Sequence, residues 1–135
     1  MRVFVCDDMA DMRLLMRLTL EEVPGLEVVG EADNGASALA GVAESQPDVV
    51  LVDLSMPGMD GLELIPRLRQ LVPAPGIVVY TALASPRVEA QAFRRGADRF
   101  LKKGAPLEQL REVTRQVAYE RRGGAEEPRE AQPSG

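Results

Sequence analysis

Five short runs of β-type residues alternate along this chain with segments in which apolar residues recur at helical spacing. Such alternation predicts a strand followed by a helix five times over, and strands that are joined through helices run parallel. The runs at Val49–Val52 and 77–80 are apolar without alternation, which is typical of strands covered by helices on both faces. The sequence therefore predicts a doubly wound α/β fold, with the common strand order 2-1-3-4-5 and helices on both faces of a parallel sheet.

The limits and packing faces of these elements follow from spacing and from turn residues. Strands are expected at 2–7, 26–31, 49–53, 76–81 and 98–102. The fourth helix is expected to end before Gly96, and the last to run from Pro106 to about Arg122. The first two helices are expected to pack through two apolar stripes, which are Met12, Leu15, Leu18 and Val23, and Ala36, Leu39, Ala40 and Ala43.

Length and composition indicate one soluble domain. A chain of 135 residues that is 45% apolar and 27% charged has the size and make-up of a single globular core. Residues 1–122 are expected to form that domain, and 123–135, which lack apolar periodicity, a disordered tail or truncated linker. No apolar run approaches the roughly 18 residues of a membrane span, and the first one stops too soon for a secretory signal, so we expect a cytoplasmic protein with no membrane partner.

The rare residues exclude several kinds of site. The chain has no histidine and one cysteine, so Ser-His-Asp hydrolysis, metal sites built of His and Cys, and an internal disulfide are excluded. We expect the single cysteine, Cys6, to be a buried apolar residue. The net charge of −5 argues against direct binding of nucleic acid by this chain, since that function usually needs a basic face.

Polar residues stand where the predicted strands end. The pair Asp7-Asp8 comes after the first strand, Asp53 ends the third, Thr81 ends the fourth, and Lys103 follows the fifth. Because parallel strands end at one edge, and strands one and three are neighbours, the three acids are expected within several Å of one another. Two such charges about 4 Å apart repel by roughly 4 kcal/mol at an effective dielectric constant near 20. Oxygen ligands suit a hard divalent cation, so the sequence predicts a Mg²⁺ site.

Together these motifs resemble the receiver domain of two-component response regulators. The resemblance covers about residues 1–120. It rests on Asp7-Asp8, on the segment Val-Asp-Leu-Ser-Met-Pro-Gly-Met-Asp-Gly at 52–61, on Thr81-Ala82 and on Gly-Ala-Asp-Arg-Phe-Leu-Lys-Lys at 96–103. The segments at 28–32 and 94–98 are similar to receivers of the NarL/FixJ type, which are joined to a LuxR-type helix-turn-helix domain. The family implies a (βα)5 flavodoxin-like fold and a signalling module that is not an enzyme beyond weak self-phosphotransfer and autodephosphorylation.

The resemblance also implies a role for each acid. Asp53 is expected to be the phosphoacceptor, which attacks a phosphohistidine of a sensor histidine kinase. Asp8, Asp53 and the backbone carbonyl of Ser55 are expected to bind Mg²⁺, and Asp7 to act through a coordinated water. Taken alone, Asp53 is also compatible with a turn or cap residue, and Asp7-Asp8 with the cap of the first helix.

Three further residues are implied in transfer and switching. The family's lysine lies three residues after an aromatic on the last strand, which selects Lys103 rather than Lys102, and it flanks the transferring oxygens. Thr81 is expected to bond a phosphoryl oxygen, and Phe100 to turn inward as Thr81 moves. This switch reshapes the surface of helix four, strand five and helix five, and so controls an output partner, a homodimer formed on phosphorylation, or an absent DNA-binding domain that regulates transcription.

One position departs from what many receivers carry, and another bears on the lifetime of the acyl phosphate. Gly104 follows Lys103 where many relatives have a proline with a cis bond, and we expect a trans bond because a cis bond before a residue other than proline costs about 2.5–4 kcal/mol. Leu83 lies two residues after Thr81 and cannot orient water, which predicts slow hydrolysis of the acyl phosphate.

Other protein classes fit the sequence less well. A phosphatase of the haloacid dehalogenase type needs a second Asp two residues after the nucleophile, and Ser55 stands there. A flavodoxin-like cofactor binder needs a phosphate loop after the first strand and aromatic residues around a flavin, and the chain has neither. A receiver-like protein that acts without phosphorylation would normally lack one of the acids or the lysine.

Overall fold

The computed structural model describes residues 1–123, and its ten elements alternate strictly between strand and helix. The strands form one parallel sheet in the order β2-β1-β3-β4-β5, as predicted. The predicted fold class is therefore confirmed. The strands are β1 (Arg2–Cys6), β2 (Glu27–Ala32), β3 (Val49–Val52), β4 (Gly76–Thr81) and β5 (Arg99–Lys102).

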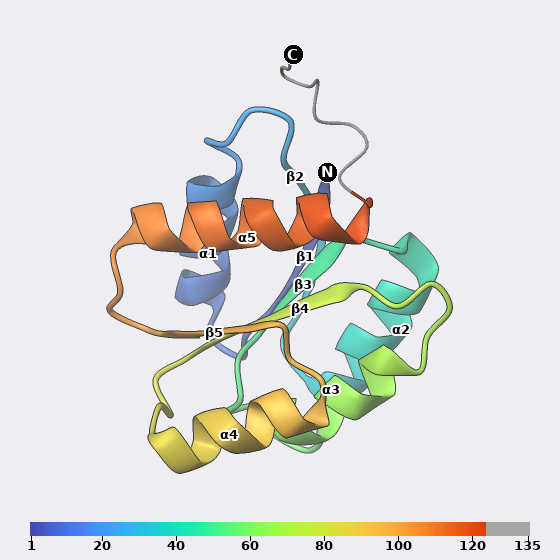
Figure 1. Cartoon of the computed structure of the whole chain (residues 1–135), viewed down its shortest axis with the longest axis vertical. Helices are drawn as coiled ribbons and strands as arrows, with labels where there is room; N and C mark the ends of the chain where they lie inside the picture. Colours follow the sequence, from blue (N-terminus) through green and yellow to red (C-terminus); the bar gives the residue numbers. More distant parts are fainter. Residues whose placement is uncertain (124–135) are drawn as a thin grey trace.

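Helices cover both faces of the sheet, with α1 and α5 on one face and α2, α3 and α4 on the other (Figure 1). Three of them begin at a residue whose side chain accepts a hydrogen bond from a backbone N–H of the helix. These residues are Asn34 before α2, Asp60 before α3 and Ser85 before α4. The helices are α1 (Ala10–Leu20), α2 (Gly35–Ser45), α3 (Gly61–Arg69), α4 (Pro86–Arg95) and α5 (Leu107–Arg121).

The sheet divides the core into two clusters. Alternate residues of β1 enter different clusters: Val3 and Val5 pack with α1 and α5, whereas Phe4 and Cys6 pack with α2 and α3. All four residues of β3 and all six of β4 are buried, as expected for strands covered on both faces. Cys6 is buried and free, and burial, with the nearby charge of Asp7, raises the pKa of its thiol.

The predicted packing faces of the first two helices are wrong in part. In α1, Leu15 and Leu18 are exposed, and the helix packs through Met16, Thr19 and Leu20. In α2 the buried residues are Gly35, Ala38 and Val42, while Ala36, Ala40 and Ala43 are exposed and Leu39 is partly buried. In both helices the sheet buries a face that apolar spacing did not single out.

The predicted domain runs to residue 122, and α5 ends at Arg121. The expected tail at 123–135 falls, apart from Gly123, outside the described residues. Within residues 1–123, no helix combines the length and the apolar character that crossing a bilayer requires.

Candidate functional site

The three acids meet at the carboxyl edge of the sheet. Asp7 follows β1 and Asp53 follows β3, and the Asp53 N–H donates to the Cys6 carbonyl at 3.0 Å, which holds the two strand ends together. One carboxylate oxygen from each of Asp7, Asp8 and Asp53 lies within 4.8 Å of the others. The predicted convergence of the acids is therefore confirmed. Asp7 and Asp53 are buried, whereas Asp8 is exposed.

Hydrogen bonds fix the two buried carboxylates. Asp7 accepts the Met9 N–H at 2.9 Å through Oδ1. Asp53 accepts two bonds through Oδ1, from the Thr81 hydroxyl at 2.9 Å and from the Ser55 N–H at 3.3 Å. Buried carboxylates need such partners, and these donors hold the acids in place.

Lys103 is the cation that the structure brings to these acids. Its Nζ lies 2.7 Å from Oδ2 of Asp7 and 3.4 Å from Oδ2 of Asp53. Burial alone lowers the pKa of Lys103, but the hydrogen bond to Asp7 and the charge of Asp53 outweigh it, so the pKa is raised overall. Lys102, by contrast, is exposed, so of the two lysines it is Lys103 that lies in the site.

Thr81 joins the fourth strand to the site. Its hydroxyl is fully buried, donates to Asp53 and accepts the Leu83 N–H at 3.2 Å. The Thr81 carbonyl accepts the Lys103 N–H at 2.8 Å, so the same residue also holds the end of β5. Phe100 is paired with Val79 across the β4 and β5 strands, and it is partly buried against the α2, α3 and α4 side of the core.

The remaining predicted residues lie around this centre. Ser55 is exposed and its N–H faces Asp53. Leu83 is 52% exposed beside Thr81. Within residues 1–123 the cis peptide bond is Val72–Pro73, so the Lys103–Gly104 bond is trans, as expected; Gly104 adopts φ +103°, a value that favours glycine.

A close backbone approach shapes the loop after Asp53. A Cβ added to Gly61 would lie 2.5 Å from the Asp53 carbonyl oxygen and 2.7 Å from the Leu54 Cα. Only glycine therefore lets α3 begin so close to the acid. This backbone contact was not predictable from the sequence.

Sequence reasoning also missed Arg13 and Glu31. The Arg13 guanidinium donates to the Asp7 carbonyl at 2.8 Å and to the Glu31 carboxylate at 2.7 Å, and Arg17 also bonds Glu31. The two arginine hydrogen bonds outweigh partial burial and lower the pKa of Glu31. Helical side chains lean toward the N-terminus, so Arg13 in the first turns of α1 can reach back to the acid that follows β1, but the sequence alone does not single it out.

The donor set fits a hard divalent cation. Three carboxylates within 4.8 Å offer only oxygen, and one of them is exposed to bulk solvent, which suits an ion that keeps part of its water. The acids therefore form a site that can hold a metal ion.

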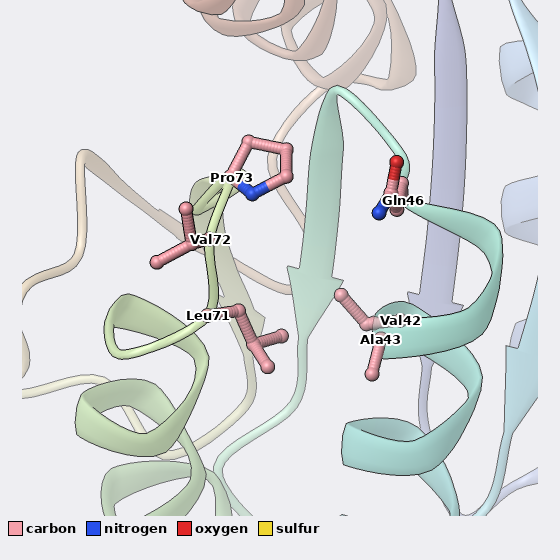
Figure 2. Close-up of a pocket in the computed structure, with 6 residues that line it drawn as sticks. All are labelled: Val42, Ala43, Gln46, Leu71, Val72 and Pro73. Atoms are coloured by element: carbon pink, nitrogen blue, oxygen red, sulfur yellow. The ribbon is translucent and has the colours of Figure 1, made fainter.

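A separate pocket lies away from these acids, between the end of α2 and the connection from α3 to β4, where strands β3 and β4 begin (Figure 2). It carries no carboxylate or cation, and Val72 at its rim is 93% exposed. The acidic site is therefore not part of it. Its lining is Val42, Ala43, Gln46, Leu71, Val72 and Pro73.

Comparisons with known proteins agree with this site. The family model described as response regulator receiver domain matches residues 3–115. Response regulator GacA of Pseudomonas aeruginosa is 37% identical over 116 residues, which cover 86% of this chain and 54% of that protein. A protein-glutamate methylesterase/protein-glutamine glutaminase of Desulfotalea psychrophila is 39% identical over 105 residues, which cover 76% of this chain and 29% of that protein. The chain thus spans about half or less of these relatives.

Among solved structures, the signal receiver domain of the putative response regulator NarL from Mycobacterium tuberculosis is similar in both fold and sequence. It superposes with a TM-score of 0.81 at 34% identity, and the match covers 87% of this chain and 94% of that one.

Proposed function

The chain belongs to the response regulator receiver family, and from this membership we propose that it accepts a phosphoryl group on Asp53 from a sensor histidine kinase, with Mg²⁺ as cofactor. The observation that carries the proposal is the meeting of Asp7, Asp8 and Asp53 within 4.8 Å beside Lys103. The acids offer ligands to a metal, and the lysine offers a positive charge to a phosphoryl group.

In the proposed step, a carboxylate oxygen of Asp53 attacks phosphorus and the bond from phosphorus to the donor's imidazole nitrogen breaks, with the imidazole leaving as the neutral base once protonated. Asp8, Asp53 and the Ser55 carbonyl would hold Mg²⁺ directly and Asp7 would act through a coordinated water, and the bound ion would neutralise charge on the phosphoryl oxygens. Lys103 Nζ, already 3.4 Å from Asp53, contacts a phosphoryl oxygen.

Thr81 and Phe100 form the proposed switch. The Thr81 hydroxyl, which donates to Asp53 at 2.9 Å, transfers this bond to a phosphoryl oxygen after modification. The partly buried Phe100 then turns further inward and reshapes the surface of α4, β5 and α5. This surface controls an output, by homodimer formation, by a partner, or by a DNA-binding domain joined to a receiver of residues 1–122.

The role of the chain is signalling rather than turnover of a substrate. One relative is named for methylesterase activity, but the match covers only 29% of that protein, so we do not extend that activity to this chain. Self-phosphorylation and slow loss of the phosphoryl group are the only reactions proposed for it.

Intact mass after incubation with acetyl phosphate and Mg²⁺ tests the proposal. Wild type is expected to gain the mass of one phosphoryl group, and Asp53→Asn to gain none. Asp11→Asn is the matched control, since Asp11 is an exposed acid in the first turn of α1 and lies outside the cluster. An unmodified wild type, or equal modification of Asp53→Asn, contradicts the proposal.

A further inference from the structure

Arg13 ties the backbone of the first acidic loop to the edge strand. Its Nη1 donates to the Asp7 carbonyl at 2.8 Å while its Nε donates to Glu31 Oε1 at 2.7 Å. Only 18% of the Arg13 side chain is exposed, compared with 33% for Arg17 on the same helix. Partial burial strengthens both bonds, because water competes less for the guanidinium.

The end of β2 therefore holds Asp7 from two sides. The Asp7 N–H donates to the Ala32 carbonyl at 3.1 Å, and its carbonyl is bonded by Arg13, which is itself anchored on Glu31. Glu31 and Ala32 are the last two residues of β2, so this strand fixes both peptide units of Asp7.

Asp8 depends on these peptide units for its orientation. The Asp7 carbonyl and the Asp8 N–H belong to one planar peptide, so a bond to that carbonyl also sets the direction of the Asp8 backbone. On the other side, the Met9 N–H is held by the Asp7 carboxylate at 2.9 Å. Among residues 1–123 no group donates a hydrogen bond to the exposed Asp8 carboxylate itself, so the backbone, which sets the direction of the Asp8 Cα–Cβ bond, is what orients this side chain.

We propose that Arg13 is a positioning residue for metal binding, which holds the peptide between Asp7 and Asp8 so that the Asp8 carboxylate faces the metal. The inference rests on the proposed function of the acidic site, and it adds a residue that touches neither metal nor phosphoryl group. Partners outside the ligand shell typically affect metal affinity by about 10- to 100-fold in other proteins.

Arg17 provides a matched control within the same helix. It also pairs with Glu31, but its guanidinium makes no bond to Asp7. Loss of either arginine removes an ion pair with Glu31, and only loss of Arg13 releases the Asp7 carbonyl. Arg17→Ala therefore reports the loss of an ion pair with Glu31 alone, and the difference between the two variants reports the release of the Asp7 carbonyl.

The experiment measures Mn²⁺ affinity by titration calorimetry and the rate of phosphorylation by acetyl phosphate as a function of Mg²⁺ concentration, with the full chain. In Arg13→Ala, the metal concentration for half-maximal rate and the Mn²⁺ dissociation constant are expected to rise about tenfold, with the maximal rate at saturating Mg²⁺ within about twofold of wild type. In Arg17→Ala, both quantities are expected to stay within about twofold of wild type. Glu31→Ala removes the carboxylate that holds the Arg13 guanidinium but keeps Arg13, and it is expected to weaken Mn²⁺ binding by a smaller factor than Arg13→Ala. If Arg13→Ala does not fold, Glu31→Ala is the variant that tests the inference.

Two outcomes overturn the inference. One is unchanged Mn²⁺ affinity in Arg13→Ala, whether or not the maximal rate falls, and the other is equal weakening of Mn²⁺ binding in Arg13→Ala and Arg17→Ala. A wild type that neither binds Mn²⁺ nor takes up a phosphoryl group overturns the proposed function and this inference with it. That last outcome is visible before any variant is made, so the two failures are distinguishable.

Discussion

Lys103 balances the charge of two buried acids that come from distant parts of the sequence. Its Nζ bonds Asp7 at 2.7 Å and pairs with Asp53 at 3.4 Å, and only 17% of its side chain is exposed. With Lys103 removed, the two buried carboxylates would lack this cation, and a buried charge without a partner lowers the stability of the folded state.

We therefore expect Lys103→Met to lower the free energy of unfolding at pH 7, without metal, by about 3 kcal/mol. Urea unfolding in the presence of a chelator measures this difference. The pKa of Lys103 is raised from its usual 10.5, so its contribution is present below that pH and is lost as pH rises through the folded-state value. The gap between wild type and variant should accordingly shrink in alkaline solution, and a constant gap would contradict this account.

Leu83 is expected to influence the lifetime of the proposed acyl phosphate on Asp53. Its side chain is hydrocarbon and 52% exposed beside the Thr81 hydroxyl, so it offers no group that orients a water for attack on phosphorus. We expect a phosphoryl group on wild type to persist for minutes or longer in a phosphate-release assay. Leu83→Gln is expected to shorten that lifetime, and a wild-type half-life of seconds would refute the prediction.

At the scale of elements, the junction between β3 and α3 depends on the absence of a side chain at Gly61. An added Cβ would lie 2.5 Å from the Asp53 carbonyl oxygen, although alanine is otherwise favoured over glycine in a helix by about 1 kcal/mol. Gly58, in the same connection, has φ +73° and open space around its Cβ position.

Gly61→Ala is therefore expected to lower the free energy of unfolding by about 2 kcal/mol and to slow phosphorylation, because overpacking displaces the Asp53 backbone. Gly58→Ala is expected to cost about 1 kcal/mol through its backbone conformation alone, and to leave the phosphorylation rate unchanged. Urea unfolding and acetyl phosphate kinetics on both variants check this. A stabilised Gly61→Ala would show that the contact is easily relieved.

The strands were predictable from the sequence more securely than the helix faces. Uninterrupted apolar runs fixed β3 and β4 to within a residue. In α1, apolar residues occur on every side of the helix, so spacing allowed several stripes, and contacts with the sheet selected Met16 and Leu20. In α2, small residues left the face equally open, and packing selected Val42 with Ala38.

The site likewise contains residues that were predictable from the sequence and one that was not. The rule that parallel strands end at one edge was enough to bring Asp7, Asp53 and Thr81 together, because it depends only on topology. Lys103 was separated from Lys102 by resemblance to a family. Arg13 was not predictable, since its bond to the Asp7 carbonyl depends on how α1 lies against β2.

At the scale of the whole molecule, a metal ion held by the three acids would link metal binding to folding. The chain folds around carboxylates that repel one another, and a cation bound between them favours the folded state alone. Stabilisation is expected to grow with metal concentration and to reach about 2.7 kcal/mol at a hundred times the dissociation constant.

We therefore expect the melting temperature of wild type to rise with added Mg²⁺ and Mn²⁺. Asp8→Asn removes one ligand at an exposed position and is expected to abolish most of that rise, whereas Asp11→Asn keeps it. Calorimetric melting curves across a metal titration make the measurement. An equal rise in Asp8→Asn and wild type would place the ion elsewhere.

The ion pair between Lys103 and Asp7 joins residues 96 positions apart. During synthesis on the ribosome, a nascent chain that has exposed only its first four strands already contains all three acids but lacks the cation that balances them. The centre therefore becomes complete only when the last strand has left the exit tunnel and joined the sheet. Under the proposed function, a nascent chain can therefore accept a phosphoryl group in this centre only after Lys103 has emerged from the tunnel and β5 has joined the sheet.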